Sequence, residues 1–151
     1  MIRVQPEDFD VGHEIALLTR GNNSIGGVAC FIGLVRDLAG EQAIGAMTLE
    51  HYPGMTEREL ARIEDEALRR WPAVVASLIV HRHGRLQPGD RIVLVATASA
   101  HRAAAFEACA FLVDYLKTKA PFWKQEETPE GARWVAADAR DDDAAKRWTT
   151  D

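Results

Sequence analysis

The stretch Asp114–Glu127, DYLKTKAPFWKQEE, joins the end of an expected long helix to the segment that follows it. Pro121 ends that helix, because proline lacks a backbone N–H and disfavours helical geometry in the residue before it. Lys117, Lys119 and Lys124 lie among the aromatic residues of this stretch. Apolar surroundings and neighbouring positive charges lower a lysine pKa, which suits general acid–base or nucleophilic chemistry near neutral pH. Alternatively, they are ordinary lysines that favour the negative end of a helix dipole.

The composition predicts one globular domain over residues 1–151. A chain of this length can bury a substantial core, and its 47% hydrophobic and 27% charged residues are ordinary proportions for such a domain. No apolar run approaches the ~20 residues that a membrane helix needs, and the first ten residues are too polar for a secretory signal. We therefore expect a cytoplasmic protein with no membrane association.

The charge pattern points to a small anionic partner. A net charge of −5 argues against nucleic-acid binding through bulk charge. Carboxylates cluster in 57–66 and 138–143, whereas Arg36, His101, Arg102 and the three lysines lie elsewhere. A local basic patch on an anionic chain suggests a small anionic ligand, or the acidic tail of a partner.

Cysteine and histidine give little support for metal or disulfide chemistry. Cys30 and Cys109 have no paired spacing, and each is expected to be a small core residue. His81 and His83 would share a strand face as metal ligands do, but no third ligand is near in sequence, so no metal site is expected. Neither a GxxxxGK[ST] loop nor a GxGxxG motif is present, so nucleotide-dependent chemistry has no visible site.

Several segments have the pattern of strands. Gly26–Val35 is a continuous apolar run that predicts a buried strand, and Leu38–Gln42 after it reads as a turn. Gly45–Tyr52 alternates between an apolar and a polar face, which predicts a half-exposed strand. The other expected strands are a short one within residues 1–10, Val74–His83, Arg91–Ala98 and a short one at Arg133–Ala137.

Four segments predict helices. Thr56 and Glu59 form a capping-box pattern, and Pro72 ends the helix that they begin. Ser99 is a plausible N-cap for a long helix over Ala100–Lys119, with Val11–Thr19 and Asp141–Trp148 as shorter ones. The strands and helices follow no regular βαβ order, so the expected class is α+β. The residues expected on the buried faces are Leu60, Ile63, Ala67 and Trp71 in the first helix, and Ala103, Phe106, Ala110 and Val113 in the long one.

His101 and Arg102 lie at the start of the long helix. Free backbone N–H groups and the helix dipole favour an anion there, so the pair predicts a seat for a phosphate or carboxylate. The alternative is an ordinary solvated first turn.

Four long motifs follow one another in order over nearly the whole chain: TLEHYPGMTE (Thr48–Glu57), SAHRAAAFEA (Ser99–Ala108), DYLKTKAPFWK (Asp114–Lys124) and TPEGARWV (Thr128–Val135). Together they resemble the large, catalytic subunit of the molybdopterin synthase family. The resemblance implies an α/β-hammerhead-like mixed fold with an additional small antiparallel β subdomain.

The resemblance also implies a sulfurtransferase reaction. That family converts cyclic pyranopterin monophosphate (precursor Z) into molybdopterin, by installing two sulfurs as a dithiolene. The sulfur arrives as a thiocarboxylate on the C-terminal Gly-Gly of a small ubiquitin-like subunit. Two large subunits form a central homodimer within a heterotetramer, and no cofactor is implied.

Residue by residue, Lys117 and Lys124 match the catalytic lysines of the family. Arg36 matches the arginine that ends its strand motif, and His101 and Arg102 match its substrate-binding pair.

Further substrate-binding residues are implied next to these. Gln125 and Glu126 adjoin Lys124 in the same segment. Leu34 and Val35 precede Arg36, and because Leu34 stands where family members often have lysine, a backbone contact is expected there.

The helix geometry predicts a site shared between subunits. Lys117 follows His101 by sixteen residues, which is roughly 24 Å along one helix at ~1.5 Å per residue. A pterin phosphate spans about half that distance. We therefore expect His101 and Arg102 to reach the site from the neighbouring subunit of a two-fold dimer.

Two other functions compete with sulfur transfer. One is a non-catalytic module that binds a ubiquitin-like tail in a basic, aromatic groove. The other is a phosphatase or lyase that acts on a phosphorylated heterocycle without sulfur.

Overall fold

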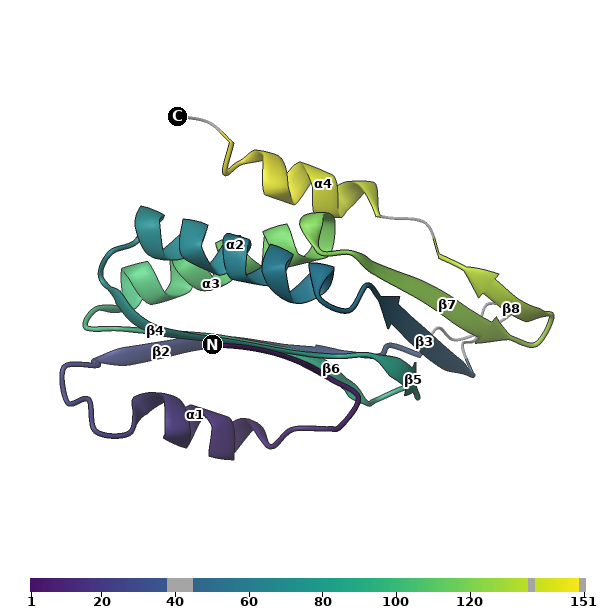
Figure 1. Ribbon diagram of the computed structural model, residues 1–151, viewed down its shortest axis with the longest axis horizontal. Coiled ribbons are helices and arrows are strands. Elements are labelled where there is room, and N and C mark those ends of the chain that lie inside the picture. Colours follow the sequence, from purple (N-terminus) through teal and green to yellow (C-terminus); the bar gives the residue numbers. More distant parts are fainter. Residues whose placement is uncertain (38–44, 136–137, 150–151) are drawn as a thin grey trace.

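Two four-stranded sheets form the framework of the protein, for which a computed structural model describes residues 1–37, 45–135 and 138–149 (Figure 1). In the first sheet, β1 is parallel to β4, and the other neighbours are antiparallel. The predicted turn at Leu38–Gln42 lies outside the described residues. In spatial order, the strands of the first sheet are β1 (Ile2–Gln5), β4 (Val74–Arg82), β6 (Arg91–Ser99) and β2 (Gly27–Leu34).

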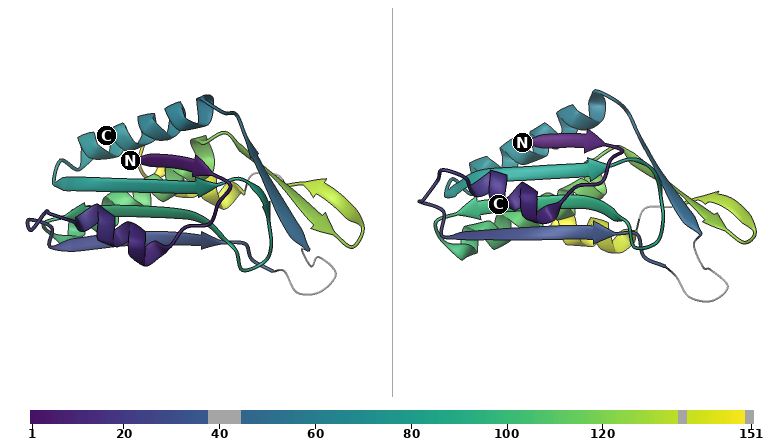
Figure 2. Two further views of the ribbon diagram at one scale, coloured as in Figure 1. Left: turned by 60° about the horizontal axis from the view of Figure 1, so that its bottom comes forward. Right: turned by 90° about the horizontal axis from the view of Figure 1, so that it is seen from below.

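The second sheet is antiparallel throughout and projects from one end of the first (Figure 2). The alternation predicted for Gly45–Tyr52 is confirmed, since Met47 and Leu49 are buried and Glu50 is exposed. The expected mixed fold with a small antiparallel subdomain is confirmed as well. In spatial order, the strands are β5 (Gly84–Leu86), β3 (Ala46–His51), β7 (Phe122–Thr128) and β8 (Gly131–Trp134).

Helices cover both faces of the first sheet. One helix lies on one face, two pack on the other, and the last helix packs on α3 near the C-terminus (Figure 1). The bounds predicted for the helix Val11–Thr19 are confirmed. The helices are α1 (Val11–Thr19), α2 (Met55–Arg70), α3 (Arg102–Lys119) and α4 (Ala139–Lys146).

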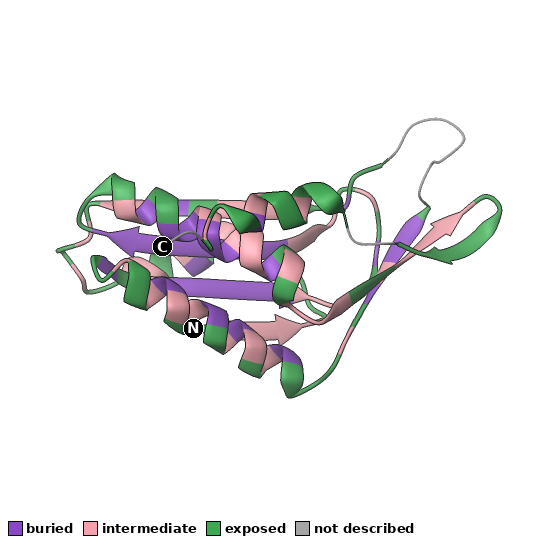
Figure 3. Cartoon of the chain, turned by 90° about the horizontal axis from the view of Figure 1, so that it is seen from above, coloured by how far each residue is buried: buried purple, intermediate pink, exposed green. Residues whose placement is uncertain are grey.

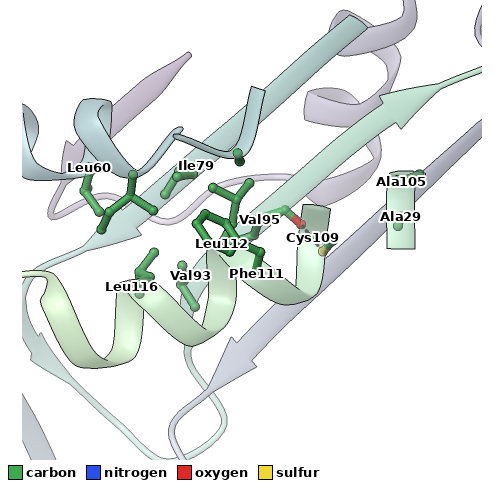
Figure 4. Close-up of a cluster of buried hydrophobic side chains, with 12 residues drawn as sticks. Ala29, Leu60, Ile79, Val93, Val95, Ala105, Cys109, Phe111, Leu112 and Leu116 are labelled. Carbon is green, nitrogen blue, oxygen red and sulfur yellow. Dashed lines mark hydrogen bonds between the residues drawn. The ribbon is translucent and has the colours of Figure 1, made fainter. Parts of the chain in front are cut away.

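The alternation of side chains along β4 divides the core into two layers. Leu78 and Val80 pack toward α1, whereas Ile79 packs in the cluster beneath α2 and α3 (Figure 4). Phe111 and Leu112 of α3 are fully buried in this second cluster. Burying side chains of this size contributes roughly 1.5–3 kcal/mol each. The exposed surface in Figure 3 is concentrated on the outer sides of the helices and at the β7–β8 hairpin.

The prediction of a fully buried strand at Gly26–Val35 is wrong in its burial. β2 is an edge strand, so only one of its flanks is paired, and among its residues only Ala29 is buried. Cys30, which was expected in the core, is exposed for the same reason. Cys109 is buried in the core, as predicted.

The start and the buried face predicted for the long helix are also wrong. β6 continues through Ser99, so His101 becomes the N-cap and the Ser99 hydroxyl donates to the His101 carbonyl. Phe106 is 63% exposed, because the helix is apolar on several sides and its packing partners select another face. The buried residues of α3 are Ala105, Ala108, Cys109, Phe111, Leu112 and Leu116.

The start of α2 uses different groups from the predicted capping box. The Glu57 carboxylate accepts a 2.6 Å hydrogen bond from the Gly54 N–H. Thr56 is buried and its hydroxyl donates to the Tyr52 carbonyl at 2.8 Å, while Glu59 pairs with Arg62. The predicted buried face is confirmed for Leu60, Ile63 and Ala67, and the helix ends at Arg70, with Trp71 as its C-cap before Pro72.

Gly26 is a position where the addition of a single methyl group is expected to destabilise the fold. A Cβ there would lie 2.1 Å from the Ala100 carbonyl oxygen, which is backbone and cannot rotate away. We expect Gly26→Ala to lower the free energy of unfolding by about 1–3 kcal/mol in urea titrations. Gly27→Ala is the matched control, because no atom lies within 4 Å of its added Cβ. Equal stabilities for the two variants would contradict this close approach.

Candidate functional site

A cavity of about 580 Å³ opens where the two sheets meet. Its walls come from the ends of β2 and β4, the first half of β6, the last turns of α3 and the start of β7. A smaller pocket of about 200 Å³ adjoins it and shares Arg36 and Lys124 with it. The polar side chains that line the large cavity are Arg36, His81, Lys117, Lys124 and Asp141.

The proline break places two lysines on two walls of this cavity. Lys117 lies in the last turn of α3, and Ala120 caps the helix with its N–H directed at the Leu116 carbonyl. β7 begins at Phe122, immediately after Pro121. Lys124 is two residues further along the strand, so it shares a strand face with Phe122. The stretch that was singled out in the sequence therefore forms one corner of the cavity.

The charged side chains that line the cavity are predominantly basic. Lys117 and Lys124 are both exposed to solvent at the cavity. The pKa of Lys124 is lowered, mainly because surrounding protein atoms remove water from its ammonium group and also because Lys117 is positively charged. The carboxylate of Asp141 opposes this effect. Together with Arg36, the two lysines offer donors to an anionic ligand.

Most of the predicted site residues meet at this cavity. Leu34, Val35, Arg36, Lys117 and Lys124 line it.

The remaining predictions have mixed outcomes. Glu126 lines the adjoining pocket, whereas Gln125 lines neither, because alternate residues of β7 point to opposite faces. His101 and Arg102 lie at the opposite end of α3 from Lys117 and line neither pocket within one chain. The composite site therefore stays a prediction.

Sequence reasoning missed His81 as a residue of this site. Its ring stacks on Phe122 with centroids 3.7 Å apart and planes 15° apart. Nδ1 donates a 2.8 Å hydrogen bond to the Arg82 carbonyl. Burial lowers its pKa to about 4, and the nearby Lys117 and Lys124 charges act in the same direction. Only its place in an otherwise apolar strand could have indicated it.

The other histidines do not form a metal centre with it. His83 contacts His51, with ring centroids 4.5 Å apart. Within residues 1–37, 45–135 and 138–149, no group of three His, Cys, Asp or Glu side chains is arranged to hold a metal ion.

The lowered pKa of His81 is expected to reduce the free energy of unfolding in acid by a measurable amount. Its pKa is about 6.5 in an unfolded chain and about 4 in the folded protein, so between these values the unfolded chain binds a proton that the folded protein does not. The free energy of unfolding therefore falls by about 3 kcal/mol as the pH drops from 7 to 4.

Ion-paired carboxylates such as Asp8 lose stability in the same direction, so the test compares two proteins. Chemical denaturation of the wild type and His81→Asn at pH 7 and pH 4 isolates the histidine. The wild type should lose about 3 kcal/mol more than the variant. Equal losses would show that His81 has the same pKa in the folded protein as in the unfolded chain.

The fold is thus that of a small α+β protein, and its cavity carries basic side chains on largely apolar walls, a combination that suits an anionic small molecule. The family model described as "MoaE protein" matches residues 4–119. The chain belongs to this MoaE family. Its relatives include proteins named molybdopterin synthase catalytic subunit and MoaE protein.

Three similar proteins illustrate the relationship. The molybdopterin synthase catalytic subunit of Ralstonia nicotianae is 56% identical over 97% of this chain and 83% of its own length. The solved structure of the molybdopterin biosynthesis MoaE protein from Burkholderia ambifaria has a TM-score of 0.86 at 54% identity, and covers 100% of this chain and 99% of that one. Molybdopterin synthase from Staphylococcus aureus has a TM-score of 0.82 at 31% identity, over 89% of this chain and 96% of that one. The chain is thereby an enzyme subunit of molybdenum cofactor biosynthesis.

Among the described residues, none of the helices has the length and apolar character needed to cross a membrane.

Proposed function

We propose that this chain transfers sulfur from a partner's C-terminal thiocarboxylate to precursor Z and so forms the dithiolene of molybdopterin. The observation that supports this most strongly is the cavity that gathers Arg36, Lys117 and Lys124 around largely apolar walls. Cations suit the phosphate of the pterin, and apolar walls suit its ring system. Lys117 and Lys124 are also the positions that match the family's catalytic lysines, and Arg36 matches the arginine that ends its strand motif.

Each round of the proposed reaction transfers one sulfur. The thiocarboxylate sulfur forms a bond to a substrate carbon, and the carbon–oxygen bond at that carbon breaks. The oxygen leaves as water after it accepts a proton or, where that carbon carries the cyclic phosphate ester, stays on the phosphate. Water then cleaves the bond between the sulfur and the acyl carbon of the tail, which releases the tail as a carboxylate. Lys117 is the proposed acid and base for these proton transfers. Lys124 and Arg36 hold the phosphate or the carboxyl terminus of the tail.

The proposed partner is the small ubiquitin-like subunit that carries the thiocarboxylate on its Gly-Gly end. A "catalytic subunit", as the Ralstonia relative is named, works with at least one other subunit. The cavity offers this tail an opening between the two sheets. Because the tail supplies an activated sulfur, we propose that the reaction needs no resident metal or cofactor, and that it takes place in the cytoplasm.

We further propose a homodimer of this chain with composite sites, within a heterotetramer. Lys117 and the His101–Arg102 pair occupy opposite ends of α3 and cannot easily hold one small ligand from the same chain. Mixing Lys117→Ala with Arg102→Ala subunits should therefore restore activity to about a quarter of the wild-type value, because half of the dimers are mixed and each has one intact site. Activity that stays at the level of the separate variants would refute the shared site.

Conversion of precursor Z in vitro tests the proposed reaction. Product should form only when the small subunit carries its terminal sulfur, and not with the unsulfurated subunit or with precursor Z alone. Product from precursor Z alone would favour a phosphatase or lyase. A tail-binding module without catalysis would bind the small subunit and give no dithiolene under any of these conditions.

A further inference from the structure

His81 is a buried polar residue in the inner wall of the cavity. The residue is 5% exposed, and it lies on the face of β4 that also carries Ile79, beneath α2 and α3. The ring of Phe122 covers one side of the imidazole at 3.7 Å. The imidazole is therefore held in a fixed orientation where β4 approaches the second sheet.

The hydrogen bond of Nδ1 fixes the tautomer. A carbonyl oxygen can only accept, so the contact with the Arg82 carbonyl places the proton on Nδ1 and leaves a lone pair on Nε2. The low pKa of His81 keeps this neutral form above about pH 4.

Nε2 has no partner of its own in the described part of the chain. The fully buried side-chain atoms without a hydrogen-bond partner belong, among described residues, to Arg3 alone. Nε2 of His81 is not among these atoms, so it is not fully buried, and the open space that His81 lines is the cavity.

The other polar side chains of the cavity give this lone pair a distinct role. Arg36, Lys117 and Lys124 are donors only, and they suit the anionic groups of a ligand. Asp141 is an acceptor, but it comes from α4 and its charge acts on Lys124. Nε2 of His81 is thus the neutral acceptor among the described side chains of this cavity.

The geometry points to His81 as a substrate-binding residue whose Nε2 accepts a hydrogen bond from an N–H group of the bound heterocycle. This inference rests on the proposed function, since a pterin supplies both the N–H donors and the phosphate. The cationic side chains bind the phosphate, and the imidazole forms a hydrogen bond to the ring system. An analogue whose ring lacks an N–H at that edge leaves the lone pair unpartnered, which makes His81 a determinant of specificity.

The test uses two substitutions, each of which keeps a polar group at the position of only one of the two imidazole nitrogens. In His81→Asn the side-chain amide can replace Nδ1 at the Arg82 carbonyl, but it leaves nothing at the position of Nε2. In His81→Gln the amide reaches toward the position of Nε2. His83→Asn is the control, because His83 lies on the same segment but does not line the cavity. Each variant is studied in complex with the small subunit.

Equilibrium binding of precursor Z is measured with the unsulfurated small subunit, so that no turnover occurs. His81→Asn should weaken binding about tenfold, as expected for the loss of one hydrogen bond, and the KM measured with sulfurated partner should rise more than kcat falls. His81→Gln should retain most of the affinity, and His83→Asn should bind as the wild type does. Wild-type affinity in His81→Asn, or equal losses in the Asn and Gln variants, would overturn the inference.

A measurement on the wild type covers the case in which a variant fails to fold. The nitrogen NMR signal of Nε2 should show an unprotonated nitrogen that shifts when precursor Z binds. An Nε2 signal that does not respond to bound precursor Z would also overturn the inference. The proposed function fails separately, if the wild type binds precursor Z but forms no dithiolene with the sulfurated partner.

Discussion

Replacing Lys117 with alanine is expected to lower the turnover of precursor Z by about a thousandfold, within the range of 10²–10⁴ that a positioned acid or base supplies. Lys117 projects from the last turn of α3 at the cavity that also holds Arg36 and Lys124. No other lysine of α3 lines this cavity, so its loss removes the proposed proton donor and acceptor from that wall. The measurement is single-turnover conversion with sulfurated small subunit.

Lys119→Ala is the matched control for this substitution. Lys119 lies in the same turn of α3 and is also exposed, but it lines a different surface pocket, with Tyr115 and Lys146. Its removal should leave turnover within about twofold, in line with the small effects of most surface substitutions. The Lys117→Ala variant should still bind the small subunit. Unchanged turnover in Lys117→Ala would contradict the catalytic role, and loss of small-subunit binding would favour a tail-binding module.

Replacing Phe111 with alanine is expected to cost roughly 3–5 kcal/mol of stability, the largest effect of any core substitution considered. Phe111 is fully buried, and its ring packs against Trp71 and Tyr115 at centroid distances of 5.4 and 4.2 Å. It also contacts Trp148, after α4, at 5.7 Å, so it connects α2, α3 and the C-terminal segment. Truncation would leave a cavity that these rigid rings cannot close.

Phe106→Ala on the same helix provides the comparison. This side chain is 63% exposed, so its removal should change the free energy of unfolding by about 0.5 kcal/mol or less. Thermal and urea unfolding of both variants give the two values directly. A Phe106→Ala variant that is as unstable as Phe111→Ala would mean that α3 packs with the face predicted from the sequence.

The contrast between these two phenylalanines shows where sequence patterns lose information. Met47 and Leu49 alternate with polar neighbours, so their buried face on β3 was predicted correctly. The long helix is apolar on several sides, so periodicity could not decide whether Phe106 or Phe111 is buried. β2 is similarly apolar, and only its place at the edge of the sheet explains the exposed Cys30.

Strands that depend on pairing were the elements that the sequence could not predict. Phe122–Thr128 is mostly polar and charged, but as β7 it is held between β3 and β8. The three-residue β5 is too short for any pattern, and its register with β3 defines it.

The site residues that lie together in one segment could be predicted from the sequence. Those that the fold brings together from separate elements could not. The proline break indicated Lys117 and Lys124 as site residues, and the resemblance to the family added Arg36. His81 and Asp141 come from β4 and α4, outside that segment, and only the tertiary structure brings them to the cavity.

The most direct test of sulfur transfer follows the sulfur itself. The small subunit is prepared with a heavy sulfur isotope in its terminal thiocarboxylate and is mixed with this chain and precursor Z. We expect both sulfurs of the dithiolene to carry the heavy isotope, and a Cys30→Ala, Cys109→Ala double variant to give the same labelling. A product with unlabelled sulfur, or a label that stays on the tail while product forms, would contradict transfer from the partner's tail.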